Sequence, residues 1–456
     1  IGAKRLGGGF RGRLDDLRLY DAVLSQNELE TLAIHCPARS LVAAWPAKPT
    51  REDTGRSRKY FLTYAAPENY RESYAALDAL GREKDQLLTE IPTTMVMADA
   101  VVTDIDRPRD TFMLVRGNYA NRGEKVQAGV PAVLPPLPAG APRNRLGLAK
   151  WLADPAHPLV ARVTVNRYWQ MYFGTGIVKT AEDFGVQGEW PSHPELLDWL
   201  ATEFVRTGWN VKAMVRLMVT SATYRQSAAA TPELTQRDPD NRLLAHGPRF
   251  RMPAEMVRDA ALYEAGLLHE QLGGPSVKPY QPSGLWKDLI MQDMDYVQSK
   301  GPDLYRRSLY TFWKRTIAPP MMANFDSALR ETCTVRENRT NTPLQALNLM
   351  NDVTFLEAAR FIGQRMLQEG GASPDDRLRY GFRLVMARPP VTPELALLRN
   401  NLQYHKDYFA SKAERVEAYL KQGDTVSDPA LDRSELAAYA AVASLILNLD
   451  EAITKE

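Results

Sequence analysis

Two apolar patterns with the period of an α-helix, between residues 194 and 219, most constrain the fold of this chain. The second pattern follows the i, i+3, i+4, i+7, i+8 spacing of one helix face, and its members are Val211, Met214, Val215, Met218 and Val219. The first pattern, "HPELLDWLATEFVRTG", stops at Gly208, and Asn210 is placed to cap the second. These signals predict two helices joined by a short turn as an αα-hairpin.

The same spacing predicts helices along most of the chain. They are expected at 68–90, 145–154, 159–174, 253–271, 342–369, 374–387, 393–420 and 433–450. Charges between the apolar positions of 68–90 are typical of a solvent-facing helix. A strand is expected at "TFMLVRGNY", and the run 305–315 fits either a strand or a helix. The predicted fold is mainly α: a multi-helix domain with αα-hairpins and irregular Pro/Gly-rich connections, plus a small β remnant at the N-terminus.

The length and the punctuation of the chain predict several structural units. A chain of 456 residues is too long for one ordinary core. The five prolines of "GVPAVLPPLPAGAP" (129–142) are typical of an extended linker. We predict an incomplete β-domain at 1–36, a region at 37–142 with an amphipathic helix, a short strand and the Pro-rich linker, and a helical domain at 143–456. Because Ile1 opens the chain inside a strand-like pattern, we expect it to be part of a longer protein.

Composition excludes some classes of function. A net charge of +2 with no marked run of Lys or Arg argues against a nucleic-acid partner. No stretch reaches the roughly 18 apolar residues of a membrane span, and 437–449 is typical of a buried helix. Cys36 and Cys333 are too few for a Cys-rich zinc site, and their spacing does not predict a disulfide. No C-x-x-C-H attaches haem here, so we predict no cofactor in this segment.

The stretch "DFGVQGEWPSHPELLDWL" (183–200) gathers acids and a histidine. Ser192 and Glu195 have the S-x-x-E spacing of a capping box, which predicts that the second half is a helix start. Capping leaves Asp183 and His193 unexplained. A histidine beside a carboxylate can hold a metal ion or act as a general base. The competing interpretation is a hydrogen-bonded structural junction, which we favour.

A second dense stretch is "RENRTNTPLQALNLMND" (336–352). Thr342 and Gln345 have the spacing of another capping box. Upstream of it, Arg336, Arg339 and Asn341 are candidates for binding an anion or another ligand near a helix N-terminus. A buried polar network that fixes the loop is the favoured alternative.

Five stretches, in order, resemble one protein family. They are "RNRLGLAKWLADPAHPLVARVTVNRYWQMYFGTGIVKTAEDFG", "PSHPELLDWLATEFVRTGWNVKAMVRLMVTSATYRQS", "YQPSGLW", "RRSLYTFWKRT" and "RTNTPLQALNLMND". The family is the planctomycete-type surface domain called PSD-one, which is found in large proteins with c-type cytochrome domains. In addition, "FRGRLDDLRLYDAVLSQNELETL" is similar to the last strand and exit of a LamG-like, concanavalin-type jelly roll.

The resemblance implies an exported protein, in the periplasm or at the cell surface, whose upstream parts carry haem c and a glycan-binding sheet. It implies no activity and no catalytic residue, because the family is one of unknown function. A histidine often follows the tryptophan of the "NRYWQ" helix in the family, whereas this chain has Gln170 and Met171. A ligand role of that histidine would be missing here.

Three functions remain open at the level of sequence. The first is a helical module for assembly or for binding a polymeric substrate, beside cytochrome c and lectin-like domains. The second is a hydrolase or lyase acting on a polysaccharide, with Asp183 and His193 beside Arg162 or Arg167 in one pocket. The third is an electron-transfer partner of a cytochrome c domain in the same protein.

Overall fold

The computed structural model describes residues 23, 55, 58–91, 93–94, 110–286, 295–314, 316–410 and 412–455. The chain divides into two compact units, Ile1–Asp110 and Thr111–Glu456. The sequence assigned to a LamG-like tail lies outside the described residues apart from residue 23. The predicted domain limits at 36 and 142 stay predictions.

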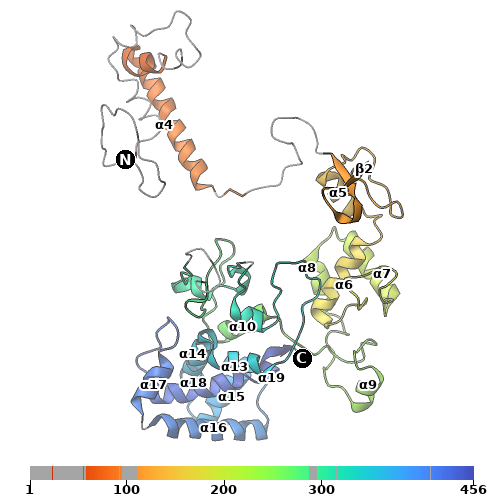
Figure 1. The fold of residues 1–456 in the computed structure, drawn as a ribbon. Helices are drawn as coiled ribbons and strands as arrows, with labels where there is room; N and C mark the ends of the chain where they lie inside the picture. The colour runs from red at the N-terminus through yellow and green to blue at the C-terminus, as the bar shows by residue number, and fades with distance from the viewer. Residues whose placement is uncertain are drawn as a thin grey trace, which may run out of the picture. The chain divides into compact units, whose positions relative to one another are not determined.

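The described residues of the first unit include one long helix. Helix α4 (Glu68–Glu90) follows a short π-helical turn, η1 (Phe61–Ala65), and has no buried residue. The predicted solvent-facing helix at 68–90 is therefore confirmed (Figure 1).

The second unit opens with a β-hairpin of strands β1 (Thr111–Leu114) and β2 (Arg122–Val126). The Pro-rich segment that follows contains no helix or strand. It is fastened to the next helix, α5 (Arg145–Leu152), because the Trp151 indole N–H donates to the Pro135 carbonyl at 2.7 Å. A Cβ at Gly147 would lie 1.8 Å from the Pro142 oxygen, so only glycine permits this approach.

Three helices then build the first core: α6 (Val160–Phe173), α7 (Pro194–Arg206) and α8 (Val211–Val219). Both α7 and α8 contact α6, so the pair predicted from the sequence closes over a third helix. The shared core consists of Ala161, Val165, Trp169, Phe173, Ile177, Val178, Leu197, Leu200, Ala201, Phe204, Met214 and Met218. Gly174 (φ 82°) and Gly208 (φ 68°) end α6 and α7 in backbone conformations that favour glycine. A short helix, α9 (Pro232–Arg237), follows.

A larger bundle forms the rest of the unit (Figure 1). Its helices are α10 (Ala254–Glu264), α12 (Pro320–Asn324), α13 (Pro343–Asn351), α14 (Val353–Glu369), α15 (Pro374–Met386), α16 (Thr392–Ala410), α17 (Ala413–Leu420), α18 (Arg433–Leu447) and α19 (Asp450–Ile453). Helix α18 is the central one and packs on α13, α14, α15, α16 and α17. Strands β3 (Phe250–Arg251) and β4 (Thr454–Lys455) pair antiparallel.

Several predicted boundaries shift. The helix predicted at 342–369 divides at Asp352, which caps α14, and the helix predicted at 393–420 divides into α16 and α17. The helix predicted at 253–271 stops at Glu264, because Gly266 takes a φ of 73°. The ambiguous run 305–315 contains 3₁₀ turns, η3 (Gly301–Tyr305) and η4 (Ser308–Tyr310), with isolated β-bridges.

The two capping boxes have different outcomes. The Thr342–Gln345 box is confirmed: each side chain bonds the other residue's backbone N–H. The Ser192–Glu195 box is wrong. Because Pro194 is the first helical residue, the cap position falls on His193, whose side chain makes no capping bond. Ser192 is one residue too early, and its hydroxyl donates to the Ile177 carbonyl instead.

None of the helices in the described part of the chain combines the length and the apolarity needed to span a bilayer.

Candidate ligand-binding site

The residues predicted from "DFGVQGEWPSHPELLDWL" have local partners. Asp183 Oδ1 accepts the backbone N–H of Gly185 at 2.6 Å, which closes a tight turn. A Cβ at Gly188 would lie 2.2 Å from the Asp183 carbonyl oxygen, so this turn requires glycine. His193 Nδ1 lies 3.0 Å from Ser192 Oγ. None of these contacts joins Asp183 to His193.

The two arginines proposed to complete that site lie on α6. Arg162 forms an ion pair with Asp198 of α7, with 2.6 Å between Nε and Oδ1, and also donates to the Pro158 carbonyl. The hydrogen bond between the two side chains raises the pKa of Arg162 and lowers that of Asp198. Arg167 is exposed. Arg162 therefore ties α6 to α7.

The candidates Arg336, Arg339 and Asn341 lie on an exposed segment before α13. Arg336 lies 3.9 Å from the Glu182 carboxylate, which brings this segment beside the Asp183 turn. Arg339 stacks on the Phe250 ring, with 4.0 Å between the guanidinium carbon and the ring centroid, and partial burial lowers its pKa. The N-terminus of α13 is satisfied by its own capping box, which leaves fewer free N–H groups for an anion.

A buried polar cluster centres on Glu357 of α14, a residue with no solvent exposure. Its carboxylate accepts hydrogen bonds from the hydroxyls of Tyr280 (2.9 Å) and Tyr305 (3.0 Å), and from the backbone N–H of Thr425 (2.8 Å). The guanidinium of Arg360, one turn further along α14, lies 3.3 Å away.

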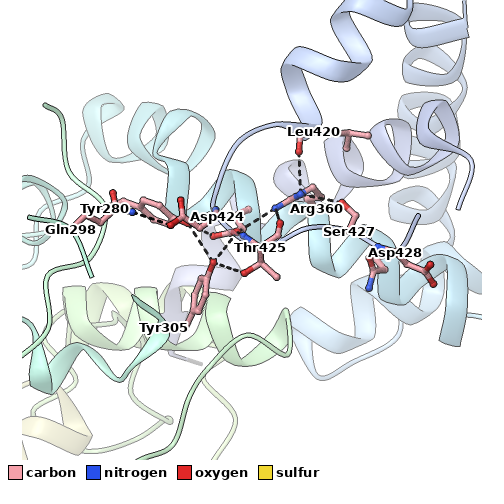
Figure 2. A network of polar contacts seen from close by, with 11 residues as sticks. Tyr280, Gln298, Tyr305, Arg360, Leu420, Asp424, Thr425, Ser427 and Asp428 are labelled. Atoms are coloured by element: carbon pink, nitrogen blue, oxygen red, sulfur yellow. Dashed lines mark hydrogen bonds and ion pairs between the residues drawn. The ribbon is translucent and has the colours of Figure 1, made fainter. Parts of the chain in front are cut away.

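Arg360 extends this network toward α17 (Figure 2). It donates to the Leu420 carbonyl and to Ser427 Oγ, each at 3.1 Å, and to the Thr425 carbonyl. Burial lowers the pKa of Arg360 and raises the pKa values of Tyr280 and Tyr305. Because its donors and acceptors are protein groups, the cluster joins the segments around 280, 305 and 425 to α14, and its role is structural.

A large open pocket lies between α16, α17 and α18. Its volume is about 680 Å³, within the range of ligand sites. It is lined by Met350, Asn401, Tyr404, His405, Tyr408, Phe409, Arg415, Ala418, Tyr419, Ala441, Ser444 and Leu445. Tyr404 and Tyr408, one turn apart on α16, are 62% and 41% exposed. Their rings are nearly parallel, with centroids 6.3 Å apart.

The pocket also contains polar groups without partners. Asn401 Oδ1 and His405 Nδ1 are buried atoms that lack a hydrogen bond. Burial lowers the pKa of His405, which favours its neutral form. Burial raises the pKa of Tyr419 to about 12, against a hydrogen bond with Ser444 that lowers it. The Arg415 guanidinium carbon lies 4.6 Å from the centroid of the Tyr408 ring.

This pocket combines aromatic faces with a few hydrogen-bonding groups. Sequence reasoning missed it, although "NLQYHKDYFA" carries a signal: Asn401, His405 and Phe409 recur at i, i+4 and i+8, with Tyr404 and Tyr408 beside them. That spacing also fits an ordinary core face, and the walls come from α17 and α18, which are distant in sequence.

Among the described residues, no group of three or more His, Cys, Asp and Glu side chains could hold a metal ion. Cys333 is an exposed free thiol, and Cys36 lies outside the described residues.

Comparison with known families identifies the family of this chain. The family model described as "PSD1: Protein of unknown function (DUF1553)" matches residues 144–402, more than half of the chain. The chain belongs to the PSD1 family. No curated protein and no solved structure matches it. The resemblance predicted from the sequence motifs is confirmed, and so is the mainly α fold.

The PSD1 match bears differently on the sites described above. It includes Asp183, His193 and the segment 336–341, and it also includes Glu357 and Arg360. It ends at Leu402, just before Tyr404, and so does not reach α17 and α18. Most residues that line the aromatic pocket, from Tyr404 to Leu445, therefore lie beyond the PSD1 match.

Proposed function

We propose that this chain is a non-catalytic helical module that binds a polymeric glycan, within an exported multidomain protein that also carries cytochrome c and lectin-like domains. The observation that carries the proposal is the aromatic pocket of α16, α17 and α18. Sugar rings have apolar faces that stack on aromatic side chains, and their hydroxyls pair with the polar groups between them.

The two kinds of group are available together in this pocket. Tyr404 and Tyr408 offer two nearly parallel rings to solvent, an arrangement suited to consecutive residues of a chain. Asn401 Oδ1 and His405 Nδ1 lack partners within the protein, and an unsatisfied buried polar atom costs roughly 1–3 kcal/mol. A ligand hydroxyl in the pocket would supply the missing partner. The open mouth of the pocket favours a polymer over a small enclosed ligand.

A binding measurement tests the proposal. The full chain is applied to a panel of soluble polysaccharides by affinity electrophoresis, with a Tyr404→Ala/Tyr408→Ala variant beside it. Loss of two stacking contacts weakens binding by about tenfold. Tyr119→Ala, at an 80% exposed tyrosine of the β-hairpin segment, is the matched control and leaves binding unchanged. Absence of binding to every glycan, or equal binding by the double variant, contradicts the proposal.

The alternative of a polysaccharide hydrolase or lyase is tested in the same preparation. It requires Asp183, His193 and an arginine to act together, whereas their hydrogen bonds go to Gly185, Ser192 and Asp198. New reducing or unsaturated ends, released by the wild type and abolished by Asp183→Asn, would establish the enzyme. We expect none.

A further inference from the structure

We propose that Arg379 and Arg383 of α15 form a second site, which binds the sulfate or carboxylate groups of an anionic polysaccharide. The two arginines line a surface hollow of about 620 Å³ together with Asp376, Tyr380, Leu384 and Pro389. They stand four residues apart on one exposed face of α15, which places their Cβ atoms about 6 Å from each other.

These two arginines differ from those around them in their partners. Within the part of the chain that the structure describes, no hydrogen bond or ion pair engages either guanidinium group. The arginines around them are paired: Arg365 with Glu369, Arg377 with Glu435, Arg388 with Glu394 and Glu451, and Arg399 with Asp375.

Two carboxylates on the same helix, Asp375 and Asp376, are already engaged. Both oxygens of Asp375 accept hydrogen bonds from Arg399, at 2.9 and 2.5 Å, and these bonds lower the pKa of Asp375 more than the charge of Arg379 does. Asp376 accepts the Ser373 hydroxyl at 2.6 Å, as part of the cap of α15. Asp376 is the one acid that lines the hollow. Two arginines against one acid leave a positive charge there.

A second hollow shares one lining residue with the first. Leu384 also lines a neighbouring space of about 650 Å³ between α14, α15 and the end of α10. Between the two spaces, the Tyr380 hydroxyl receives a hydrogen bond from Arg365 at 2.9 Å and donates to Glu369. The two hollows therefore lie on either side of Leu384 on α15, and an extended polymer is the kind of ligand that could contact both.

Guanidinium groups bind planar carboxylates and sulfates through paired N–H donors, more strongly than neutral hydroxyls. The substituents of an anionic glycan supply such groups at regular intervals. Because the contacts are exposed, salt screens them, and binding weakens as ionic strength rises. That the ligand is a glycan rests on the proposed function above. That it is anionic rests only on the two arginines of α15.

The test compares dextran sulfate, polygalacturonate and neutral dextran, with inorganic sulfate as a competitor, on the full chain at 50 and 200 mM salt. Arg379→Gln/Arg383→Gln weakens binding of at least one anionic polymer by about tenfold at the lower salt. It also flattens the salt dependence. Arg216→Gln, at an exposed arginine of α8, is the matched control. It changes neither the binding of the anionic polymers nor its salt dependence.

The outcomes separate this site from the aromatic pocket. Unchanged binding of both anionic polymers by the double arginine variant overturns the proposal, as does an equal loss in Arg216→Gln. Competition by inorganic sulfate at the same concentration of sulfate groups overturns the polymer as ligand. If Tyr404→Ala/Tyr408→Ala alone abolishes binding of the anionic polymers, they occupy the aromatic pocket and the arginine site is wrong. Loss of neutral-glycan binding in the tyrosine variant alone leaves the arginine site standing.

Discussion

At the scale of single residues, burial decides which charged groups take part in the structure. Glu357 and Arg360 are almost fully buried, and each is engaged by several partners. A Cβ at Gly423 (φ 88°) would lie 2.2 Å from the Glu357 carboxyl carbon, so the loop reaches the carboxylate only as glycine. Glu264, at the end of α10, is the opposite case: its Oε2 is buried and has no partner.

Glu264 predicts a pH dependence of stability. Burial raises its pKa from 4.5 to about 8, so the folded protein keeps a proton that the unfolded chain releases. The free energy of unfolding therefore falls as the pH rises between about 5 and 8, by up to roughly 1.4 kcal/mol per pH unit, and the loss is complete above pH 8. Below about pH 4 the carboxyl group is protonated in both the folded and the unfolded state, so it adds no pH dependence to the free energy of unfolding.

Urea denaturation of wild type and Glu264→Gln from pH 5 to 9 measures this slope. We expect the variant to lose most of it and to be the more stable protein at pH 9. Glu270→Gln, at an exposed position six residues later, is the control and keeps the wild-type slope. Identical slopes in all three proteins would show that Glu264 ionises normally.

At the scale of elements, close helix contacts depend on small residues. Gly363 of α14 faces α18, and a Cβ there would lie 2.7 Å from the backbone nitrogen of Ala440. Gly363→Ala therefore forces the two helices apart. We expect it to cost roughly 1–3 kcal/mol, measured as a lower midpoint of urea unfolding.

The same substitution in α4 provides a matched comparison. Gly81 is also a helical glycine, but no atom lies within 4 Å of its would-be Cβ. Because alanine favours a helix interior over glycine by about 1 kcal/mol, Gly81→Ala raises the helicity of α4. A destabilisation of similar size at both positions would mean that the α14–α18 contact is not the cause.

Elements were more predictable from the sequence than side-chain contacts. The helix at 343–351 is correct at its start because Thr342, Pro343 and Gln345 hold fixed positions relative to the cap. Ser192 misled because its S-x-x-E spacing ignores the rule that the cap directly precedes an N-terminal proline. Glu357 and the aromatic pocket could not be predicted, because the groups that meet there are distant in sequence and no local pattern links them. Tyr280, for example, lies 77 residues from Glu357.

At the scale of the whole molecule, the helical bundle extends beyond the PSD1 match. The match ends at Leu402, whereas α18, which packs on α13, α14, α15, α16, α17 and α19, spans Arg433–Leu447. The partners of Arg360 at Leu420, Thr425 and Ser427 also lie beyond it. A protein limited to residues 144–402 would expose the apolar faces of α14 and α16 and leave Arg360 without its acceptors at Leu420, Thr425 and Ser427.

We therefore expect residues 144–402 to be insoluble or unfolded, and residues 111–456 to unfold cooperatively. Circular dichroism with thermal denaturation compares the two fragments. A sharp transition in the shorter fragment would show that α18 is dispensable.

The pairing of β3 with β4 has a consequence for how this bundle is joined to other domains. Phe250 lies opposite Lys455, so the chain enters the bundle and returns from it at neighbouring points. A domain whose two ends meet can be inserted into a loop of a host, or receive a fusion at either end, without its helices being pulled apart. In this chain, a domain attached after β4 would begin beside β3, where the chain enters the bundle. The bundle could therefore be inserted between other domains without rearranging its helices.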